Sequence, residues 1–298
     1  MNKEMLKKVI LCPNPYRDTE LRVAREAKRI LDEANCPNVV CLPFRSEEKF
    51  DSYGLEVRLL QGELRGADML IVFGGDGTLL HLSKTAAHRD IPMLGVNLGS
   101  LGFMAELEQT ELHLLPQLCE GKYTVEQRMM LDVSVVRDGR QIYSSLALNE
   151  ALITRGNVTR VIRLHVFTDT GKLMDIAGDG VVVASPTGST AYSLSAGGPV
   201  VEPTARNFVV SPICAHSVHA NSYVLSPERT VTVQTEKTGY KPIVLSVDGG
   251  RPFSLKNGDQ VLISRSRYET KLVRLRSRSF CEILQRKMLL GGGDIHEE

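Results

Sequence analysis

Residues 69–78 read Met-Leu-Ile-Val-Phe-Gly-Gly-Asp-Gly-Thr, an apolar run that passes directly into a glycine-rich turn. The apolar part predicts a buried strand, and the leucines that follow indicate a helix beginning near Thr78. A strand-to-helix turn with little Cβ bulk lets an anion approach the free amides and the positive end of the helix. The stretch therefore predicts a phosphate-binding turn made by Gly74, Gly75, Gly77 and Thr78.

Asp76 is the charged residue of this turn. A carboxylate beside an anion site repels phosphate unless it binds a metal or accepts a proton. We therefore interpret Asp76 as functional, with a purely structural tight turn as the alternative. A second glycine-rich turn, Asn-Leu-Gly-Ser-Leu-Gly-Phe at 97–103, follows the apolar run 93–96. Because it also follows a strand, this turn could lie beside the first at the edge of the sheet where ligands of open α/β sheets bind, with a purely structural loop as the alternative.

Strand and helix signals alternate in the first third of the chain. Apolar runs at 8–12 and 39–42 predict strands, and the residues between them have helical spacing behind a cap at Asp18 or Thr19. Residues 54–67 have a helical composition interrupted by a glycine. Strands alternating with helices imply a parallel α/β layer.

After about residue 121 the apolar pattern changes to period two, and the helix signals largely vanish. Short apolar runs separated by turn sequences predict strands at 131–136, 161–167, 173–177, 231–235, 243–247 and 261–264. This part of the chain is therefore expected to be all-β, with the boundary near residues 115–123.

The chain of 298 residues carries 36 Lys plus Arg and 35 Asp plus Glu, a formal net charge of +1. A net charge so close to zero gives no overall electrostatic attraction to a nucleic acid. Any anion must therefore be bound by a local group of residues. No apolar run approaches the ~20 residues of a membrane-spanning helix, and the N-terminal run is too short for a signal peptide. We therefore expect a cytoplasmic protein with no nucleic-acid or membrane partner. Its 6 cysteines form no Cys-x-x-Cys pair, so no zinc or redox motif is indicated.

Asn149 and Glu150 interrupt an apolar stretch, with Leu-Ala-Leu before them and Ala-Leu-Ile after them. Buried polar groups need partners, so this pair requires an explanation. An amide can pair with the edge of a base, and a carboxylate can accept both hydroxyls of a ribose. The pair indicates a nucleoside site, with a strand end or bulge as the structural alternative.

Residues 178–199 carry the densest polar signal. Gly-Asp-Gly at 178–180 leads into a core strand at 181–184, and a segment rich in hydroxyl side chains follows. These hydroxyls can supply donors to ribose, phosphate and adenine, and the ring of Tyr192 offers a flat face for stacking. We expect a polar ligand site here, with a Ser- and Thr-rich capping loop as the alternative.

In these motifs the chain resembles the NAD kinase family. The resemblance rests on residues 74–78, 97–103, 149–150 and 179–199, in this order, and extends from the first strand to the C-terminal segment. It implies transfer of the ATP γ-phosphoryl group to the 2′-hydroxyl of the adenosine ribose of NAD. It further implies a divalent metal cation such as Mg²⁺, and a homodimer or homotetramer.

The domain organisation follows from the same resemblance and from the change of pattern. Residues 1–122 are expected to form an α/β domain with a parallel sheet, and the resemblance implies that residues 123–270 form an all-β NAD-binding domain. Residues 271–298 are expected to pack back on the first domain. The basic residues near this C-terminal end are interpreted as a solvated face rather than an anion site.

The resemblance assigns a role to each matched residue. Asp76 corresponds to the general base toward the 2′-hydroxyl, and Gly77 lines the same turn. Asn149 would hold the adenine, Glu150 the ribose, and Asp179 the nicotinamide-side ribose. The remaining expected substrate contacts are Arg160, Thr187, Thr190, Ala191, Tyr192, Ser193, Leu194 and Ser195.

Some positions depart from the family pattern. Gly250 has no side chain where many relatives carry Gln, His or Arg, although Arg251 is adjacent. Asn221-Ser222 stand where Arg-Pro is expected, and Ala215 stands where Pro is expected. The side-chain contact expected at Gly250 is therefore in doubt.

Two alternative functions stay open. The Gly-Gly-Asp-Gly turn also resembles that of diacylglycerol kinases and phosphofructokinases, which allows a lipid or sugar kinase. The polar segment after Asp179 argues against that alternative, because it suits a hydrophilic nucleoside acceptor. The other alternative is a non-catalytic dinucleotide sensor, for which Asp76 would be dispensable.

Overall fold

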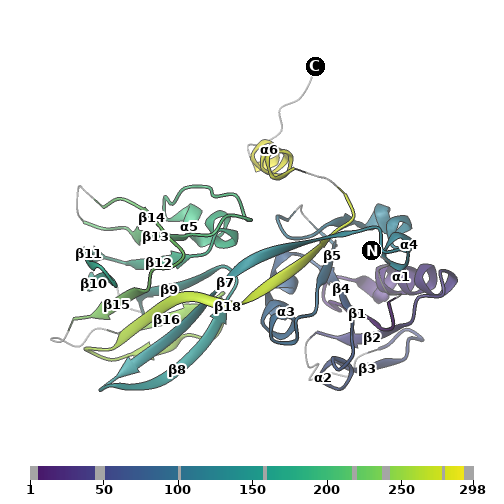
Figure 1. Cartoon of the computed structure of the whole chain (residues 1–298), viewed down its shortest axis with the longest axis horizontal. Helices are drawn as coiled ribbons and strands as arrows, with labels where there is room; N and C mark the ends of the chain where they lie inside the picture. Colours follow the sequence, from purple (N-terminus) through teal and green to yellow (C-terminus); the bar gives the residue numbers. More distant parts are fainter. Residues whose placement is uncertain are drawn as a thin grey trace. The chain divides into compact units, whose positions relative to one another are not determined.

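The chain folds into two compact units. Residues Met1–Gln127 and Thr270–Glu298 form the first unit, and residues Arg128–Glu269 form the second. The chain leaves the first unit within strand β7 (Thr124–Arg137) and returns within β18 (Gln260–Arg274), as Figure 1 shows. The computed structural model describes residues 6–43, 51–99, 102–156, 160–216, 220–236, 242–276 and 279–291, with side chains as far as residue 287.

The first unit is built on a parallel sheet with the strand order β5-β4-β1-β2-β3. The strands are β1 (Val9–Pro13), β2 (Asn38–Leu42), β3 (Val57–Leu59), β4 (Met69–Gly74) and β5 (Met93–Asn97). Every residue of β1, β4 and β5 is buried, as in parallel sheets covered on both faces. Their carboxyl ends share one edge, which positions the glycine turns. A short strand, β6 (Leu107–Glu108), pairs with β5.

The helices of this unit are α1 (Arg22–Glu33), α2 (Leu60–Glu63), α3 (Asp76–Arg89), α4 (Pro116–Cys119) and α6 (Phe280–Gly291), with 3₁₀ turns η1 (Thr19–Leu21) and η2 (Gln109–Leu114). The Asp18 carboxylate accepts hydrogen bonds from the amides of Val23 (3.0 Å) and Ala24 (2.9 Å). It therefore caps the start of α1, as the sequence predicts.

The helix predicted over residues 54–67 is wrong. The structure places strand β3 and the single turn α2 there. Gly54 has a φ of +81°, which a helix does not tolerate, and Val57 pairs in parallel with Val40 of β2. Sheet pairing at this edge therefore outweighs the helical composition.

The second unit consists almost entirely of antiparallel strands. One sheet has the order β14-β13-β12-β9-β16-β17, and the other strands pair in the order β11-β10-β15-β18, with the hairpin β7-β8 beside β18. The strands are β8 (Arg140–Ala147), β9 (Glu150–Arg155), β10 (Ile162–Thr168), β11 (Gly171–Gly178), β12 (Gly180–Ala184), β13 (Phe208–Ile213), β14 (Tyr223–Leu225), β15 (Val231–Thr235), β16 (Ile243–Val247) and β17 (Phe253–Leu255). Two short helical turns, η3 (Thr187–Thr190) and α5 (Tyr192–Ser195), follow β12.

The core of this unit is formed by inward-facing residues of both groups of strands. Leu131, Val133 and Val135 alternate with more exposed residues along β7 and join Val181 and Val183 of β12 in one buried cluster. The predicted fold class, an α/β domain with a parallel sheet followed by an all-β domain, is confirmed. Within the described residues, no helix is both long and apolar enough to span a membrane.

Candidate functional site

The Gly-Gly-Asp-Gly turn joins β4 to α3 at the carboxyl edge of the parallel sheet. Gly75 is the N-cap of α3, and its carbonyl accepts hydrogen bonds from the amides of Thr78 (2.9 Å) and Leu79 (3.3 Å). The helix thus begins at Asp76, two residues before the predicted start. Asn14, which follows β1, donates from Nδ2 to Thr78 Oγ1 at 3.0 Å and braces the turn.

Packing inside the protein requires glycine at one position of this turn but not at two others. A Cβ at Gly74 would lie 2.3 Å from Thr78 Oγ1, so the packing of the protein itself excludes a side chain there. A Cβ at Gly75 or Gly77 would meet no atom within 4 Å, and neither residue has a left-handed backbone. The fold does not require these two glycines. A phosphate that approaches the backbone closely would require that no side chain is present at these two positions.

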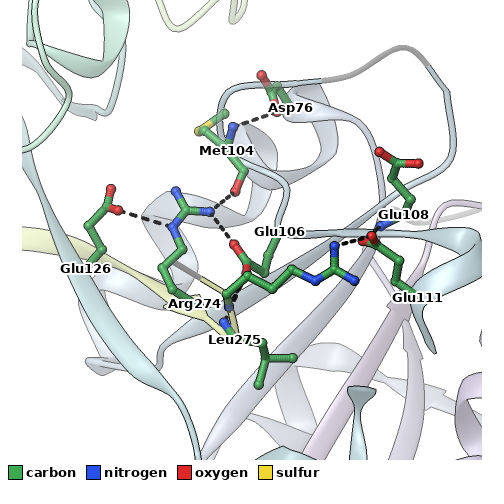
Figure 2. A network of polar contacts seen from close by, with 9 residues as sticks. Asp76, Met104, Glu106, Glu108, Glu111, Glu126, Arg274 and Leu275 are labelled. Atoms are coloured by element: carbon green, nitrogen blue, oxygen red, sulfur yellow. Dashed lines mark hydrogen bonds and ion pairs between the residues drawn. The ribbon is translucent and has the colours of Figure 1, made fainter. Parts of the chain in front are cut away.

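The described residues of the second glycine turn, 97–99 and 102–103, lie beside the first turn, and Ser100 and Leu101 lie outside the described residues. The Asp76 carboxylate accepts hydrogen bonds from the amides of Phe103 (2.7 Å) and Met104 (3.1 Å), and Figure 2 shows the contact with Met104. A Cβ at Gly102 would lie 2.1 Å from Asp76 Oδ1, so a side chain there would displace the Asp76 carboxylate from its position. Asp76 is therefore oriented by the backbone of the neighbouring loop.

A cavity of about 360 Å³ opens over both turns. It is lined by Asn14, Arg17, Gly75, Asp76, Gly77, Thr78, Asn97, Leu98, Gly99, Gly102 and Lys287. Arg17 and Lys287 have no carboxylate partner among the residues that the structure describes, and the Lys287 ammonium lies 4.4 Å from the centre of the Phe103 ring. Two cations and the start of a helix suit an anion.

The residues around the cavity fit a magnesium ion that is bound mainly by substrate phosphates and water. In the described part of the chain, no group of three or more His, Cys, Asp or Glu side chains could hold a metal ion. Asp76 is the carboxylate of the cavity. Mg²⁺ commonly binds one or two carboxylates together with substrate phosphates and waters. The donor set therefore fits a cation that arrives with nucleotide phosphates.

In the second unit, the Asn149-Glu150 pair lies at a strand end, where the chain passes from β8 to β9. The Asp248 carboxylate accepts hydrogen bonds there from the amides of Leu148 (2.8 Å), Asn149 (2.8 Å) and Glu150 (3.1 Å). The pair thus lies at a strand end whose backbone is held by Asp248, and a strand end is the structural alternative to a nucleoside site. The position of the pair alone does not decide between the two interpretations.

The unpaired atoms of these side chains favour a site. Asn149 Oδ1 and Glu150 Oε2 are buried and have no hydrogen-bond partner among the described residues. Burial raises the pKa of Glu150 to about 7, and the nearby charge of Asp248 adds to the effect. Buried polar atoms without partners cost free energy, and ligand donors such as ribose hydroxyls would supply the missing partners.

The hydroxyl-rich segment after β12 packs against this pair. Ser185 donates from its amide to the Asn149 carbonyl (2.8 Å) and from Oγ to the Leu148 carbonyl. A Cβ at Gly188 would lie 2.1 Å from the Asn149 carbonyl oxygen, so this contact requires glycine. Thr187 is buried beneath the surface of this segment, and Tyr192 is 43% exposed.

The remaining expected contacts differ in how closely they join this cluster. Thr190 and Ala191 are half-buried, Leu194 and Ser195 are exposed, and Ser193 is buried with Oγ unpaired among the described residues. Asp179 lies between β11 and β12, and its carboxylate binds the Arg155 guanidinium of β9 at 2.9 and 3.0 Å. Arg160 is exposed.

Several residues near these sites were missed by reasoning from the sequence. Asn14 follows β1, the parallel neighbour of β4, and no local sequence signal predicts its contact with Thr78. Asp248 lies 98 to 100 positions from the amides that it binds, so no local pattern predicts this contact. The interpretation of the basic C-terminal residues as a solvated face is wrong for Arg274, whose side chain is 12% exposed and forms ion pairs with Glu106 and Glu126.

A glycine turn shaped for phosphate at the edge of a parallel sheet, together with a β unit holding unpaired polar atoms, defines a nucleotide-binding protein. Comparison with known proteins narrows the class. Residues 9–123 match the ATP-NAD kinase N-terminal domain, and residues 148–275 match the ATP-NAD kinase C-terminal domain. The chain belongs to the NAD kinase family.

Individual relatives agree with this assignment. The NAD kinase of Natranaerobius thermophilus is 39% identical over 293 residues, which cover 97% of this chain and 100% of the relative. The NAD kinase of Thermoanaerobacter sp. (strain X514) is 34% identical over 95% of this chain and 99% of the relative. The ATP-dependent NAD kinase predicted from the sequence is thus confirmed, and the lipid kinase, sugar kinase and sensor alternatives are not favoured.

Solved structures share the fold. Yeast NADH kinase, crystallised with NADH, superposes with a TM-score of 0.83 at 24% identity and covers 99% of this chain and 91% of its own. An NAD kinase from Archaeoglobus fulgidus, crystallised with ATP, superposes with a TM-score of 0.72 at 24% identity over 95% of this chain and 98% of its own. The α/β unit followed by the β unit is therefore a fold that this chain shares with these solved structures.

Proposed function

We propose that this NAD kinase transfers the γ-phosphoryl group of ATP to the 2′-hydroxyl of the adenosine ribose of NAD. The observation that carries the acceptor assignment is the pair of buried, unpaired oxygens on Asn149 and Glu150. A base edge and a ribose offer the donors that these oxygens lack. The hydroxyl-rich segment packed on Asn149 supplies further contacts, and the exposed ring of Tyr192 can stack on adenine.

We assign the phosphates of ATP to the cavity over the two glycine turns. Gly75 and Gly77 leave the backbone open there, and the first turn of α3 presents its amides. Arg17 and Lys287 add positive charge at the rim of the cavity. Phosphoryl transfer asks a protein chiefly for positioning and charge neutralisation, and these residues supply both.

Asp76 is assigned as the general base. The acceptor hydroxyl loses its proton as its oxygen bonds to phosphorus, and a positioned carboxylate can take that proton. Two backbone amides hold the Asp76 carboxylate in one orientation. A divalent cation such as Mg²⁺, bound with the nucleotide, would neutralise phosphate charge, and Asp76 is the side chain that would hold it.

The test of this function is NADP formation with ATP, Mg²⁺ and NAD by wild type and by Asp76→Asn. The variant keeps the shape of the side chain but loses its charge and basicity. We expect turnover to fall at least ~10²-fold, the low end for general-base assistance, with NAD affinity unchanged. Wild-type turnover in the variant would refute the catalytic assignment, and recovery at high Mg²⁺ would reassign Asp76 as chiefly a metal ligand.

The family resemblance also supports a cytoplasmic homodimer or homotetramer with neither nucleic acid nor membrane as a partner. We propose this organisation for the chain. Size-exclusion chromatography with light scattering, at concentrations used for the activity assay, tests the oligomeric state directly.

A further inference from the structure

A buried carboxylate ties the returning end of the chain to the second glycine turn. The side chain of Glu106 is 3% exposed and lies shortly after that turn. Its Oε1 accepts hydrogen bonds from the amides of Leu275 (3.0 Å) and Arg276 (2.8 Å). Its Oε2 lies 3.3 Å from Nη1 of Arg274, so one carboxylate binds three consecutive residues.

The Arg274 guanidinium extends this network toward Asp76, as Figure 2 shows. Nη1 also donates to the Met104 carbonyl at 3.1 Å, and Nε donates to Glu126 at 3.2 Å. Met104 in turn donates its amide to Asp76 Oδ1 at 3.1 Å. Met104 is therefore held at its carbonyl by Arg274, while its amide holds the Asp76 carboxylate.

These contacts restrain the backbone that follows the second glycine turn. A side chain at Gly102 would displace the Asp76 carboxylate, and the glycine that avoids this displacement leaves the backbone free to adopt other conformations. The amides of Phe103 and Met104 orient Asp76 only if the loop is fixed from outside. A guanidinium presents several donors in a rigid fork, so Arg274 can bind the loop carbonyl and its carboxylate partners at once.

We propose that Arg274, supported by Glu106, is a positioning residue for the phosphoryl transfer. It fixes the Phe103 and Met104 amides that aim the Asp76 carboxylate, and it touches Asp76 only through Met104. The proposal rests on the proposed function, in which Asp76 is the base. It distinguishes Arg274 from Lys271 of the same strand, which pairs with Asp90 at 2.6 Å.

The first test compares Arg274→Ala with the matched control Lys271→Ala in the full-length chain. We expect kcat to fall about 10- to 100-fold in Arg274→Ala, since small misplacement of a reacting group costs this much, with the KM values for NAD and ATP changed less than about threefold. Lys271→Ala should keep kcat within about twofold. Hydrogen exchange of the Met104 amide should accelerate only in Arg274→Ala. Arg274→Lys should recover part of kcat, because an ammonium replaces the charge but not the fork.

A double-mutant cycle decides whether Arg274 acts through Asp76. In the Asp76→Asn background, Arg274→Ala should cause no further loss of single-turnover rate. Equal losses in both backgrounds, or an unchanged kcat in Arg274→Ala, would overturn the positioning role while leaving the proposed function intact. Full turnover by Asp76→Asn alone would instead overturn the assigned base. If Arg274→Ala does not fold, Arg274→Lys and Glu106→Gln carry the same cycle.

Discussion

Replacing Glu150 by Gln tests the nucleoside site through the pH dependence of stability. Burial, with a smaller effect from the charge of Asp248, raises the pKa of Glu150 from 4.5 to about 7. A raised pKa means that the folded state binds the proton more tightly than the unfolded state. The resulting stability is fully present below pH 4.5 and is lost as the pH rises through about 7. At 1.36 kcal/mol per pKa unit the total is about 3 kcal/mol.

Glu150→Gln is neutral at every pH and lacks this dependence. Relative to wild type, the variant should therefore gain up to about 3 kcal/mol in free energy of unfolding between pH 4.5 and pH 8.5. The difference in melting temperature should grow by roughly 6 °C or more over that range. Urea titrations and thermal melts at a series of pH values measure both quantities. Glu202→Gln, at an exposed position of the same unit, is the control with the same change of charge.

NAD binding should respond in the opposite sense. Above pH 7 wild-type Glu150 is ionised and accepts ribose hydroxyls, and such a contact is worth about 1.5 to 3 kcal/mol. Glu150→Gln should weaken NAD binding at least tenfold at pH 8.5, and the two proteins should converge near pH 6. Calorimetry at both pH values checks this. A stability difference that does not change with pH refutes the raised pKa, and equal NAD affinity at pH 8.5 removes Glu150 from the site.

Three further substitutions test the close approaches in the structure. Gly77→Ala should fold as wild type, since its Cβ meets no protein atom within 4 Å, yet raise the KM for ATP at least about tenfold in steady-state assays. Gly188→Ala should lower both melting temperature and NAD affinity, because its Cβ would lie 2.1 Å from the Asn149 carbonyl oxygen; an unchanged melt would contradict that packing. Lys287→Ala should weaken ATP binding about tenfold at low salt and less at high salt, and equal losses in both would show that its charge is not the cause.

The parts of the fold that the sequence predicts well are those determined locally. An apolar run ending in Gly-Gly-Asp-Gly carries its strand, its turn and the start of its helix within ten residues, and the observed helix begins only two residues early. Period-two patterns such as that of β7 define strands for the same reason. The helix wrongly predicted over residues 54–67 shows the limit, because the pairing of β3 with β2 is a property of the sheet.

The parts of the site that could not be predicted depend on contacts between distant segments. Arg274 reaches Met104 across 170 positions of sequence, and Asp248 reaches Leu148 across 100. In the sequence Arg274 is one of several basic residues of the C-terminal segment, between Lys271 and Arg276. The pairing of Leu272 with Met93 of β5 and the contact with the Met104 carbonyl place it beside the second glycine turn. No local pattern encodes that register, so the residue looked like part of a solvated face.

Asp76 and Asp248 both accept hydrogen bonds from backbone amides, but the two carboxylates have different roles. Each carboxylate accepts backbone amides of a loop that joins two strands, two for Asp76 and three for Asp248. Asp76 faces a cavity with two cations, so its charge is available to the chemistry there. Asp248 lies close to the buried Glu150, and its negative charge adds to the effect of burial in raising the pKa of Glu150. A smaller fraction of Glu150 is therefore ionised at a given pH. Asp248 therefore holds the backbone of the nucleoside site in shape, while burial, with a smaller contribution from Asp248, determines the pH at which Glu150 becomes ionised.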